Sequence, residues 1–263
     1  MNASSSHLNN LPLNQQIVLV TGGARGLGLH LVKAFLGQGA KVVINYLNSQ
    51  EQAENLAAAS DGQAIAVQAD VCKPDAVQSM VEKAQNHFQA PIVTVVNNAL
   101  PHFLFDGDDR PHADALNWDH LTQQFEGIMR GALNTTQACL PGMRQAKFGR
   151  IINIGTNLFQ NPVVPYHDYT AAKAALLSFT RTFANDLGPD NITVNMISGG
   201  LLRTTDASAA TPEAVFELIA ANTPLRRVTT PDEFADCALF FASPWARAVT
   251  GQNLVVDGGL VKN

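Results

Sequence analysis

The sequence predicts an α/β protein: a doubly wound, seven-stranded parallel sheet with helices on both faces, in a three-layer αβα arrangement. Seven short apolar runs rich in Val and Ile recur along the chain. Most gaps between them hold segments with helical periodicity. The composition agrees, because 46% of the 263 residues are hydrophobic and only 15% are charged, against roughly 25% charged residues in an average soluble domain. We therefore expect a large buried core.

The predicted strands are β-branched and bounded by turn residues, as expected of parallel strands buried on both faces. They are residues 17–20, 41–44, 64–67, 92–96, 150–154, 192–197 and 253–256. The predicted helices repeat apolar residues at a spacing of three and four. They are residues 27–38, 51–59, 74–88, 118–144 and 170–187. No linker or internal repeat divides the chain, so we expect one domain over residues 14–263, preceded by a disordered tail of residues 1–13.

Charge and cysteine content exclude several classes of protein. The net charge is −5, which lacks the basic excess that nucleic-acid binding requires. No window approaches the ~18 apolar residues of a membrane span, and the N-terminus is polar where a signal peptide is apolar. We therefore expect a cytoplasmic protein without a membrane or nucleic-acid partner. Cys72, Cys139 and Cys237 lack a CxxC spacing, which argues against a disulfide framework or a zinc site and predicts buried free thiols.

A glycine-rich segment, residues 21–28, follows the first predicted strand and opens a helix. Glycines there permit a tight turn and close approach of the backbone to a pyrophosphate, while the helix N-terminus supplies N–H donors. The segment therefore predicts a dinucleotide site, with a purely structural turn as the alternative. The predicted contacts are Gly22, Arg25, Gly26, Leu27 and Gly28.

The end of the second predicted strand bears on the choice of cofactor. Sites that prefer NAD place an acidic residue there to bind the ribose hydroxyls. Here the strand ends in Asn45 and Tyr46, and no acid precedes Glu51. Arg25 can in addition pair with a 2′-phosphate through its planar guanidinium. We expect NADP(H) to be preferred over NAD(H), with Asn45 and Tyr46 at the cofactor; the alternative for Arg25 is an exposed turn residue.

Tyr169 and Lys173 are four residues apart at the start of a helical segment, so they share one helix face. A nearby ammonium stabilises the phenolate and lowers the pKa of a tyrosine, which is otherwise near 10. Such a tyrosine is able to give a proton to a carbonyl oxygen as hydride arrives. The pair alone only suggests a carbonyl-reducing site, and the other motifs of the chain supply its context.

These features together resemble the short-chain dehydrogenase/reductase family, and within it the 3-oxoacyl-acyl-carrier-protein reductase-like members. The resemblance runs from Gln16 to the C-terminus. It rests on the glycine pattern, Asn97-Asn98-Ala99, the Tyr169/Lys173 pair, Asn195, and the ending of residues 250–259. It implies a Rossmann-type fold and a homo-oligomer, a dimer or a tetramer, packed through the helices of residues 118–144 and 170–187.

The resemblance also implies roles for individual residues. Tyr169 becomes the proton donor, Lys173 holds the nicotinamide ribose, and Thr156 stands where the family has a catalytic serine. The implied cofactor contacts are Asp70 and Val71 at the adenine, Asn98 and Ala99 beside the ribose, and Leu202 and Thr204 at the carboxamide. Simpler alternatives stay open for some of them: a helix N-terminal acid for Asp70, strand-end caps for Asn97 and Asn98, and a backbone-bonding hydroxyl for Thr156.

The sequence departs from the family pattern at several positions. Threonine at 156 keeps the hydroxyl but restricts its rotamer, so we expect altered substrate tolerance. The family's asparagine that supports a water chain to the lysine falls at Ile128, which cannot form a hydrogen bond, and we expect Asn134 to face elsewhere. Leu100 replaces a glycine, and Gly199-Gly200 replaces Pro-Gly.

Two segments are expected to shape the substrate pocket. Residues 100–117 form a longer connection than is usual in the family, with Phe103 and Phe105 toward the substrate; its His and Asp residues indicate a solvated loop in preference to a metal site. Residues 201–222 are expected to close over the site and exclude water.

The sequence thus predicts an NADPH-dependent reductase that converts a ketone or 3-oxoacyl group, as a small-molecule carbonyl or an acyl thioester, into a secondary alcohol. One alternative is the reverse activity, an NAD(P)-dependent secondary-alcohol dehydrogenase. Another is a weakly active or non-catalytic dinucleotide sensor on the same fold, which Ile128 and Thr156 would suit, although such a sensor has no need of the Tyr169/Lys173 pair.

Overall fold

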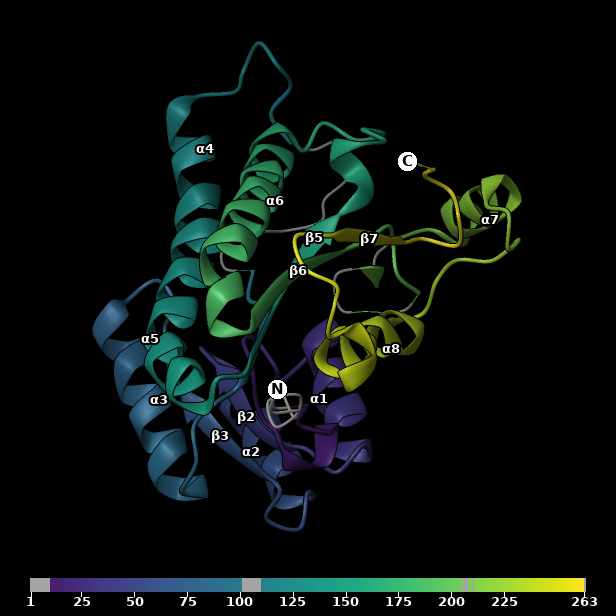
Figure 1. Ribbon diagram of the computed structural model, residues 1–263. Helices are drawn as coiled ribbons and strands as arrows, with labels where there is room; N and C mark the ends of the chain where they lie inside the picture. The colour runs from purple at the N-terminus through teal and green to yellow at the C-terminus, as the bar shows by residue number, and fades with distance from the viewer. Residues whose placement is uncertain (1–9, 101–109, 204, 206–207, 210, 263) are drawn as a thin grey trace, which may run out of the picture.

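The computed structural model describes residues 10–100, 110–203, 205, 208–209 and 211–262 (Figure 1). Within these residues a seven-stranded sheet has the order β3-β2-β1-β4-β5-β6-β7, and every neighbouring pair is parallel. The strands are β1 (Ile17–Val20), β2 (Lys41–Tyr46), β3 (Ala64–Gln68), β4 (Thr94–Asn97), β5 (Gly149–Thr156), β6 (Ile192–Gly199) and β7 (Asn253–Val256). The predicted fold class and all seven predicted strands are confirmed.

Helices cover both faces of the sheet, which confirms the predicted three layers. They are α1 (Gly26–Gly37), α2 (Gln50–Ala58), α3 (Pro74–Phe88), α4 (Trp118–Phe125), α5 (Gly131–Ala146), α6 (His167–Leu187), α7 (Glu213–Asn222) and α8 (Pro231–Ala242). Side chains of α1, α2 and α8 form the core on one face, and those of α3, α5 and α6 form the core on the other. In Figure 1, α1 and α8 lie together on one side of the sheet, with α3, α5 and α6 on the other.

The strand order reverses between β1 and β4. The chain moves outward from β1 through β2 to β3, then returns across β1 to β4 and continues to β7. Val20 of β1 is in register with Val96 of β4, so the segments that follow these two strands emerge side by side. Ligands of open α/β sheets bind in the crevice at such a switch point, beyond the carboxyl ends of the strands.

The predicted continuous helix over residues 118–144 is wrong in one respect. A π-helical turn, η3 (Glu126–Arg130), separates α4 from α5 and has Ile128 at its centre. A π turn accommodates one extra residue per turn without ending the helix. Apolar periodicity therefore continues through it, and the sequence pattern does not reveal it.

The edges of the sheet also differ from the prediction of seven strands buried on both faces. β3 and β7 are each paired on one side only, and both contain partly or fully exposed residues. Among the cysteines, Cys139 is buried but Cys72 and Cys237 are only partly buried, so the prediction of buried thiols is right for one of the three.

The described chain is attached to the core before the predicted domain boundary at residue 14. The side-chain amide of Gln16 donates to the carbonyl oxygen of Leu11 at 2.8 Å, and a short helical turn begins at Leu13. Across the described ranges, every helix is too short or too polar to cross a bilayer.

Candidate active site

The glycine loop between β1 and α1 has the geometry that its sequence predicts. Gly22 and Gly26 adopt left-handed φ values of 62° and 52°, which glycine reaches without strain. A Cβ atom on Gly28 would lie 2.0 Å from the carbonyl oxygen of Gly22, so only glycine lets the loop fold onto the first turn of α1. Arg25 is exposed and occupies the N-cap position of α1. The open N-terminus of α1 is suited to an anionic ligand.

Asn45 holds this loop in place through hydrogen bonds of its side chain. Its side-chain oxygen accepts a hydrogen bond from the backbone N–H of Gly22 at 3.2 Å, and its amide nitrogen donates to the carbonyl oxygen of Ala69 at 3.0 Å. Both Asn45 and the following Tyr46 are buried. Their direct contact with a cofactor stays a prediction, and the observed role of Asn45 is to join the glycine loop to the ends of β2 and β3.

The segment after β4 is bound to the same loop. The hydroxyl of Thr21 accepts from the backbone N–H groups of Asn98 and Ala99, both at 2.9 Å, and the Asn98 side chain donates to the carbonyl oxygen of Thr21 at 2.9 Å. The side chain of Asn98 therefore acts as a cap for backbone groups, as the simpler alternative expects. The contacts of Asn98 and Ala99 with a cofactor ribose stay predictions.

The adenine end shows a similar local role for Asp70. Its carboxylate accepts from the backbone N–H of Cys72 at 2.9 Å, just before α3 begins. Asn134 of α5 donates to the carbonyl oxygen of Val71 at 2.8 Å, and so it faces this loop; the sequence predicts only that it faces elsewhere than residue 128. The contacts of Asp70 and Val71 with adenine stay predictions.

A buried polar network connects the central strands to the helices behind the site. The amide of Asn97 donates to Asn153 of β5 at 2.8 Å, and the hydroxyl of Thr135 donates to the side-chain oxygen of Asn97 at 2.5 Å. Asn153 donates in turn to the hydroxyl of Thr180 in α6 at 2.9 Å. Asn97 is thus a structural residue that fixes β4, β5, α5 and α6 relative to one another.

The three predicted catalytic side chains meet beside this network, and all three are buried. Tyr169 lies in the first turn of α6, and Thr156, at the end of β5, forms a hydrogen bond with it. The Lys173 ammonium nitrogen lies 5.6 Å from the centre of the Tyr169 ring and donates to the carbonyl oxygen of Ile154 at 2.6 Å. The hydroxyl of Thr156 also accepts from the backbone N–H of Leu158 at 3.2 Å, as the simpler alternative expects, while its catalytic role stays a prediction.

Burial has the largest effect on the pKa values of Tyr169 and Lys173. It raises the pKa of the Tyr169 phenol well above its usual value, and the hydrogen bond with Thr156 opposes this only in part. Burial also lowers the pKa of Lys173 to about 7. The predicted lowering of the Tyr169 pKa by Lys173 is therefore not the net effect in the protein alone. Tyr169 is a protonated phenol at neutral pH.

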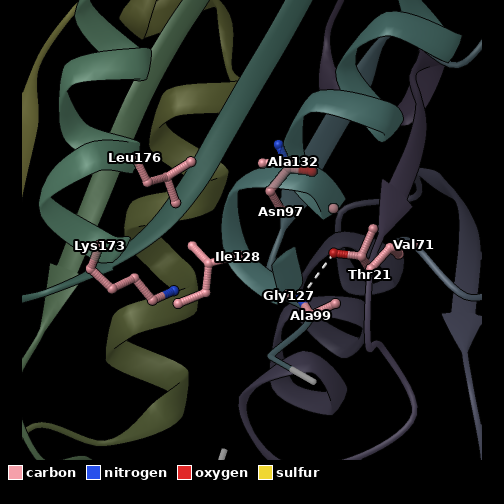
Figure 2. A pocket seen from close by; sticks show the side chains of 10 residues that line it. Thr21, Val71, Asn97, Ala99, Gly127, Ile128, Ala132, Lys173 and Leu176 are labelled. Atoms are coloured by element: carbon pink, nitrogen blue, oxygen red, sulfur yellow. Dashed lines mark hydrogen bonds between the residues drawn. The ribbon is translucent and has the colours of Figure 1, made fainter. Parts of the chain in front are cut away.

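A small cavity of about 10 Å³ lies between Lys173 and the strand ends (Figure 2). It has room for about one water molecule. Thr21, Asn97 and Ala99 line one side, and Figure 2 shows Ile128 and Lys173 pointing toward one another. An apolar side chain thus occupies the wall where the resemblance places an asparagine.

Two polar contacts beside the site were not predicted. Arg110, in the connection between β4 and α4, forms an ion pair with Asp168, which directly precedes Tyr169. Asn157, which directly follows Thr156, donates to Asp257 at 2.8 Å. The one signal for Arg110 in the sequence is its place in the unusually long segment of residues 100–117, and Asp257 lies in the ending that supports the resemblance.

Asp257 is buried and holds the chain after β7 in place. Its carboxylate also accepts from the backbone N–H groups of Gly259 and Val261, both at 3.0 Å. A Cβ atom on Gly200 would lie 2.9 Å from the Asn157 amide nitrogen, so the glycine after β6 leaves room for this contact. Three segments distant in sequence therefore meet next to Thr156.

Some predicted residues are outside the described ranges. These are Thr204, and Phe103 and Phe105 within residues 101–109. Leu202 is half-buried, and its carbonyl oxygen accepts from the hydroxyl of Ser208 at 2.7 Å. In the part of the chain that the structure describes, no three His, Cys, Asp or Glu side chains are grouped as a metal site requires.

Comparisons with known proteins cover nearly the whole chain. A family model described as enoyl-(acyl carrier protein) reductase matches residues 22–261. The chain is 34% identical to a 3-oxoacyl-[acyl-carrier-protein] reductase of Synechocystis, over 95% of this chain and 98% of that protein. It is 32% identical to a versicolorin reductase of Emericella nidulans, over 97% and 98% respectively. A solved structure of a Serratia marcescens short-chain dehydrogenase/reductase double mutant superposes with a TM-score of 0.82, at 30% identity, over 95% of this chain and 99% of that one.

Proposed function

The chain belongs to the short-chain dehydrogenase/reductase family, and from that premise we propose that it reduces a ketone or a 3-oxoacyl group to a secondary alcohol with NADPH. The observation that carries the proposal is the convergence of Tyr169, Lys173 and Thr156 beside the switch point of the sheet. A pure binding module has no use for a buried phenol, ammonium and hydroxyl at one point.

The crevice fits a dinucleotide. The close packing of Gly28 onto Gly22 and the open N-terminus of α1 form a cradle of backbone N–H groups for a pyrophosphate. We assign Gly22, Arg25, Gly26, Leu27 and Gly28 to that end. When bound, the nicotinamide supplies the hydride. The absence of an acid at the end of β2, together with the exposed Arg25, supports a preference for the 2′-phosphate of NADP(H).

The residues of this chain divide the remaining chemistry. The hydroxyls of Thr156 and Tyr169 bind the substrate carbonyl oxygen, and Tyr169 gives its proton to that oxygen as it becomes an alkoxide. Lys173 binds the nicotinamide ribose. Because burial keeps the phenol of Tyr169 protonated, the site is suited to donate a proton to the substrate oxygen during reduction.

The surroundings of Tyr169 support an apolar substrate. Tyr169 belongs to a cluster of aliphatic and aromatic side chains. The partly buried members contributed by the segment between β5 and α6 are Leu158, Phe159 and Val164. Two relatives are named as a 3-oxoacyl-[acyl-carrier-protein] reductase and a versicolorin reductase, and we propose an apolar carbonyl substrate for this chain.

We also propose that the chain forms a homotetramer in the cytoplasm. Two separate apolar surfaces support two interfaces. Trp118 and Phe125 are exposed on α4, and Phe240, Trp245 and Leu254 are exposed around α8 and the edge strand β7. Each is the kind of patch that a second copy covers. Light scattering at the monomer mass of 28.1 kDa would contradict this proposal.

The decisive test is single-turnover oxidation of bound NADPH by a panel of ketones and 3-oxoacyl thioesters. We expect rapid oxidation with at least one of them. Tight binding of NADPH without turnover on any compound would favour a sensor and contradict the proposal.

The cofactor preference has its own test in Arg25→Ala. If Arg25 pairs with the 2′-phosphate, we expect the Kd of NADPH to rise by about tenfold, the scale of one charge-assisted hydrogen bond. The Kd of NADH, which lacks that phosphate, serves as the control and should stay unchanged. An unchanged Kd for NADPH would remove Arg25 from the site.

A further inference from the structure

A buried ion pair lies directly beside the proposed proton donor. Arg110 comes from the connection between β4 and α4, and Asp168 from the first turn of α6. Their side chains are only 12% and 8% exposed. Asp168 directly precedes Tyr169, so the pair holds the turn of the helix that carries the phenol.

Aromatic contacts extend this pair toward Tyr169. The Arg110 guanidinium lies over the ring of Tyr166, 5.7 Å from its centre. The Tyr166 ring in turn meets the Tyr169 ring edge-on, with 6.3 Å between centres. The Arg110 guanidinium therefore packs on the Tyr166 ring, which in turn packs on the Tyr169 ring.

The start of α6 lacks one common form of local support. Tyr166 occupies the N-cap position without a side-chain capping hydrogen bond, whereas Asn117 and Thr230 cap α4 and α8 with theirs. The contact from Arg110 supplies a fixed point at this place from a segment 58 residues earlier. Residues 110–117 are thereby connected to the catalytic helix.

We propose that Arg110 and Asp168 are a positioning pair for Tyr169: Arg110 fixes the first turn of α6 and the Tyr166 ring, and it neutralises the buried carboxylate of the residue that precedes Tyr169. The proposal rests on the function proposed above. It goes beyond that function because neither residue belongs to the motifs that carry the family resemblance.

The charges around Tyr169 make the proposal testable, because the two substitutions should move the pH profile in opposite directions. In the described ranges, α6 contributes His167, Asp168 and Lys173, and Tyr166 lies at its N-cap. The 110–117 segment contributes Arg110, β5 contributes the neutral hydroxyl of Thr156, and η3 contributes the apolar Ile128. Removing Arg110 leaves an uncompensated carboxylate, which disfavours the phenolate. Removing the charge of Asp168 leaves an uncompensated guanidinium, which favours it.

The test compares Arg110→Met, Asp168→Asn and the double variant in the holoenzyme, using oxidation of the product alcohol, which requires the phenolate. We expect the pH profile to move to higher pH in Arg110→Met and to lower pH in Asp168→Asn, each by about half a unit. The double variant should return to the wild-type profile. We expect kcat to fall by about tenfold in each single variant, with the Kd of NADPH within about twofold of wild type. Shifts in the same direction, or no shift, would overturn the proposal.

Two controls keep the result interpretable. Arg144→Met breaks an exposed ion pair with Asp190, whose side chains are 53% and 37% exposed, and should leave the profile unchanged. If Arg110→Met does not fold, Arg110→Lys retains the charge without the planar guanidinium, and it should keep the wild-type profile with a lower kcat; a displaced profile would count against the proposal.

Tyr169→Phe separates this proposal from the function on which it rests. Full activity of Tyr169→Phe would contradict the proposed function. An inactive Tyr169→Phe together with wild-type behaviour of Arg110→Met and Asp168→Asn would contradict only the positioning pair.

Discussion

The two sides of the crevice differ in the groups that form them: backbone on one side and buried side chains on the other. On the side of β1, α1 and β2, the site consists of backbone in unusual conformations, with Gly22, Gly26 and Gly28 as its essential residues. On the side of β5 and α6, it consists of buried side chains that meet from distant parts of the chain. On the proposed function, the first side binds the cofactor through its shape and N–H groups, and the second carries out proton transfer.

This difference explains what the sequence reveals about the site. The requirement for glycine is local, so the loop and its geometry are predictable from eight consecutive residues. The partners on the catalytic side are 58 residues apart for Arg110 and Asp168 and 100 residues apart for Asn157 and Asp257. No local pattern specifies such pairs, because tertiary packing decides which buried polar groups meet.

Gly28→Ala tests the backbone side and has the largest expected effect. The added Cβ would lie 2.0 Å from the Gly22 carbonyl oxygen, so the loop must move away from α1. We expect the Kd of NADPH to rise by about 100-fold or more, along with a lower Tm. Gly37→Ala on the same helix is the matched control, because a Cβ there meets nothing within 4 Å. Wild-type binding by Gly28→Ala would mean that the loop is not a cofactor cradle.

Lys173 tests the catalytic side through the pH dependence of stability. Burial lowers its pKa in the folded protein to about 7 from 10.5, so between these values the unfolded chain holds one more proton. The free energy of unfolding should therefore rise with pH in that window, by up to about 1.4 kcal/mol per unit. Denaturant titrations of wild type and Lys173→Met should diverge from pH 7 to 10, with the wild type gaining relative to the variant. Parallel curves would show that Lys173 is not buried in a way that affects its protonation.

Asn157→Ala gives a smaller effect on the same side. It leaves the buried carboxylate of Asp257 without one of its three donors, which costs about 1–3 kcal/mol of stability. Because Asn157 adjoins Thr156, we expect kcat to fall by about tenfold while the Kd of NADPH stays unchanged.

The control for Asn157→Ala is Gln78→Ala, which removes an exposed amide–carboxylate hydrogen bond on α3. Surface substitutions of this kind change stability by at most about 0.5 kcal/mol. Equal losses in kcat for the two variants would show that the contact with Asp257 does not position Thr156.

The fold was predictable for a related reason. Seven apolar runs are strong local signals, and each of them is a strand. The π turn around Ile128 was not predictable, because its apolar spacing continues that of the flanking helices. α8 had a usable signal, since Thr230 and Glu233 form a capping box at its start. The electrostatic environment of Tyr169 could not be predicted from the sequence. It depends on the burial of Tyr169 and Lys173 and on the ion pair between Arg110 and Asp168.

Tyr169 is proposed to donate the proton to the substrate oxygen, while binding of NADPH at the glycine loop does not require its hydroxyl. The most direct test is Tyr169→Phe, with the Kd of NADPH and the single-turnover rate of NADPH oxidation by a reducible ketone measured on the same sample. We predict an unchanged Kd and a rate lower by about 100-fold or more, the contribution expected of a general acid. A wild-type rate would contradict the account.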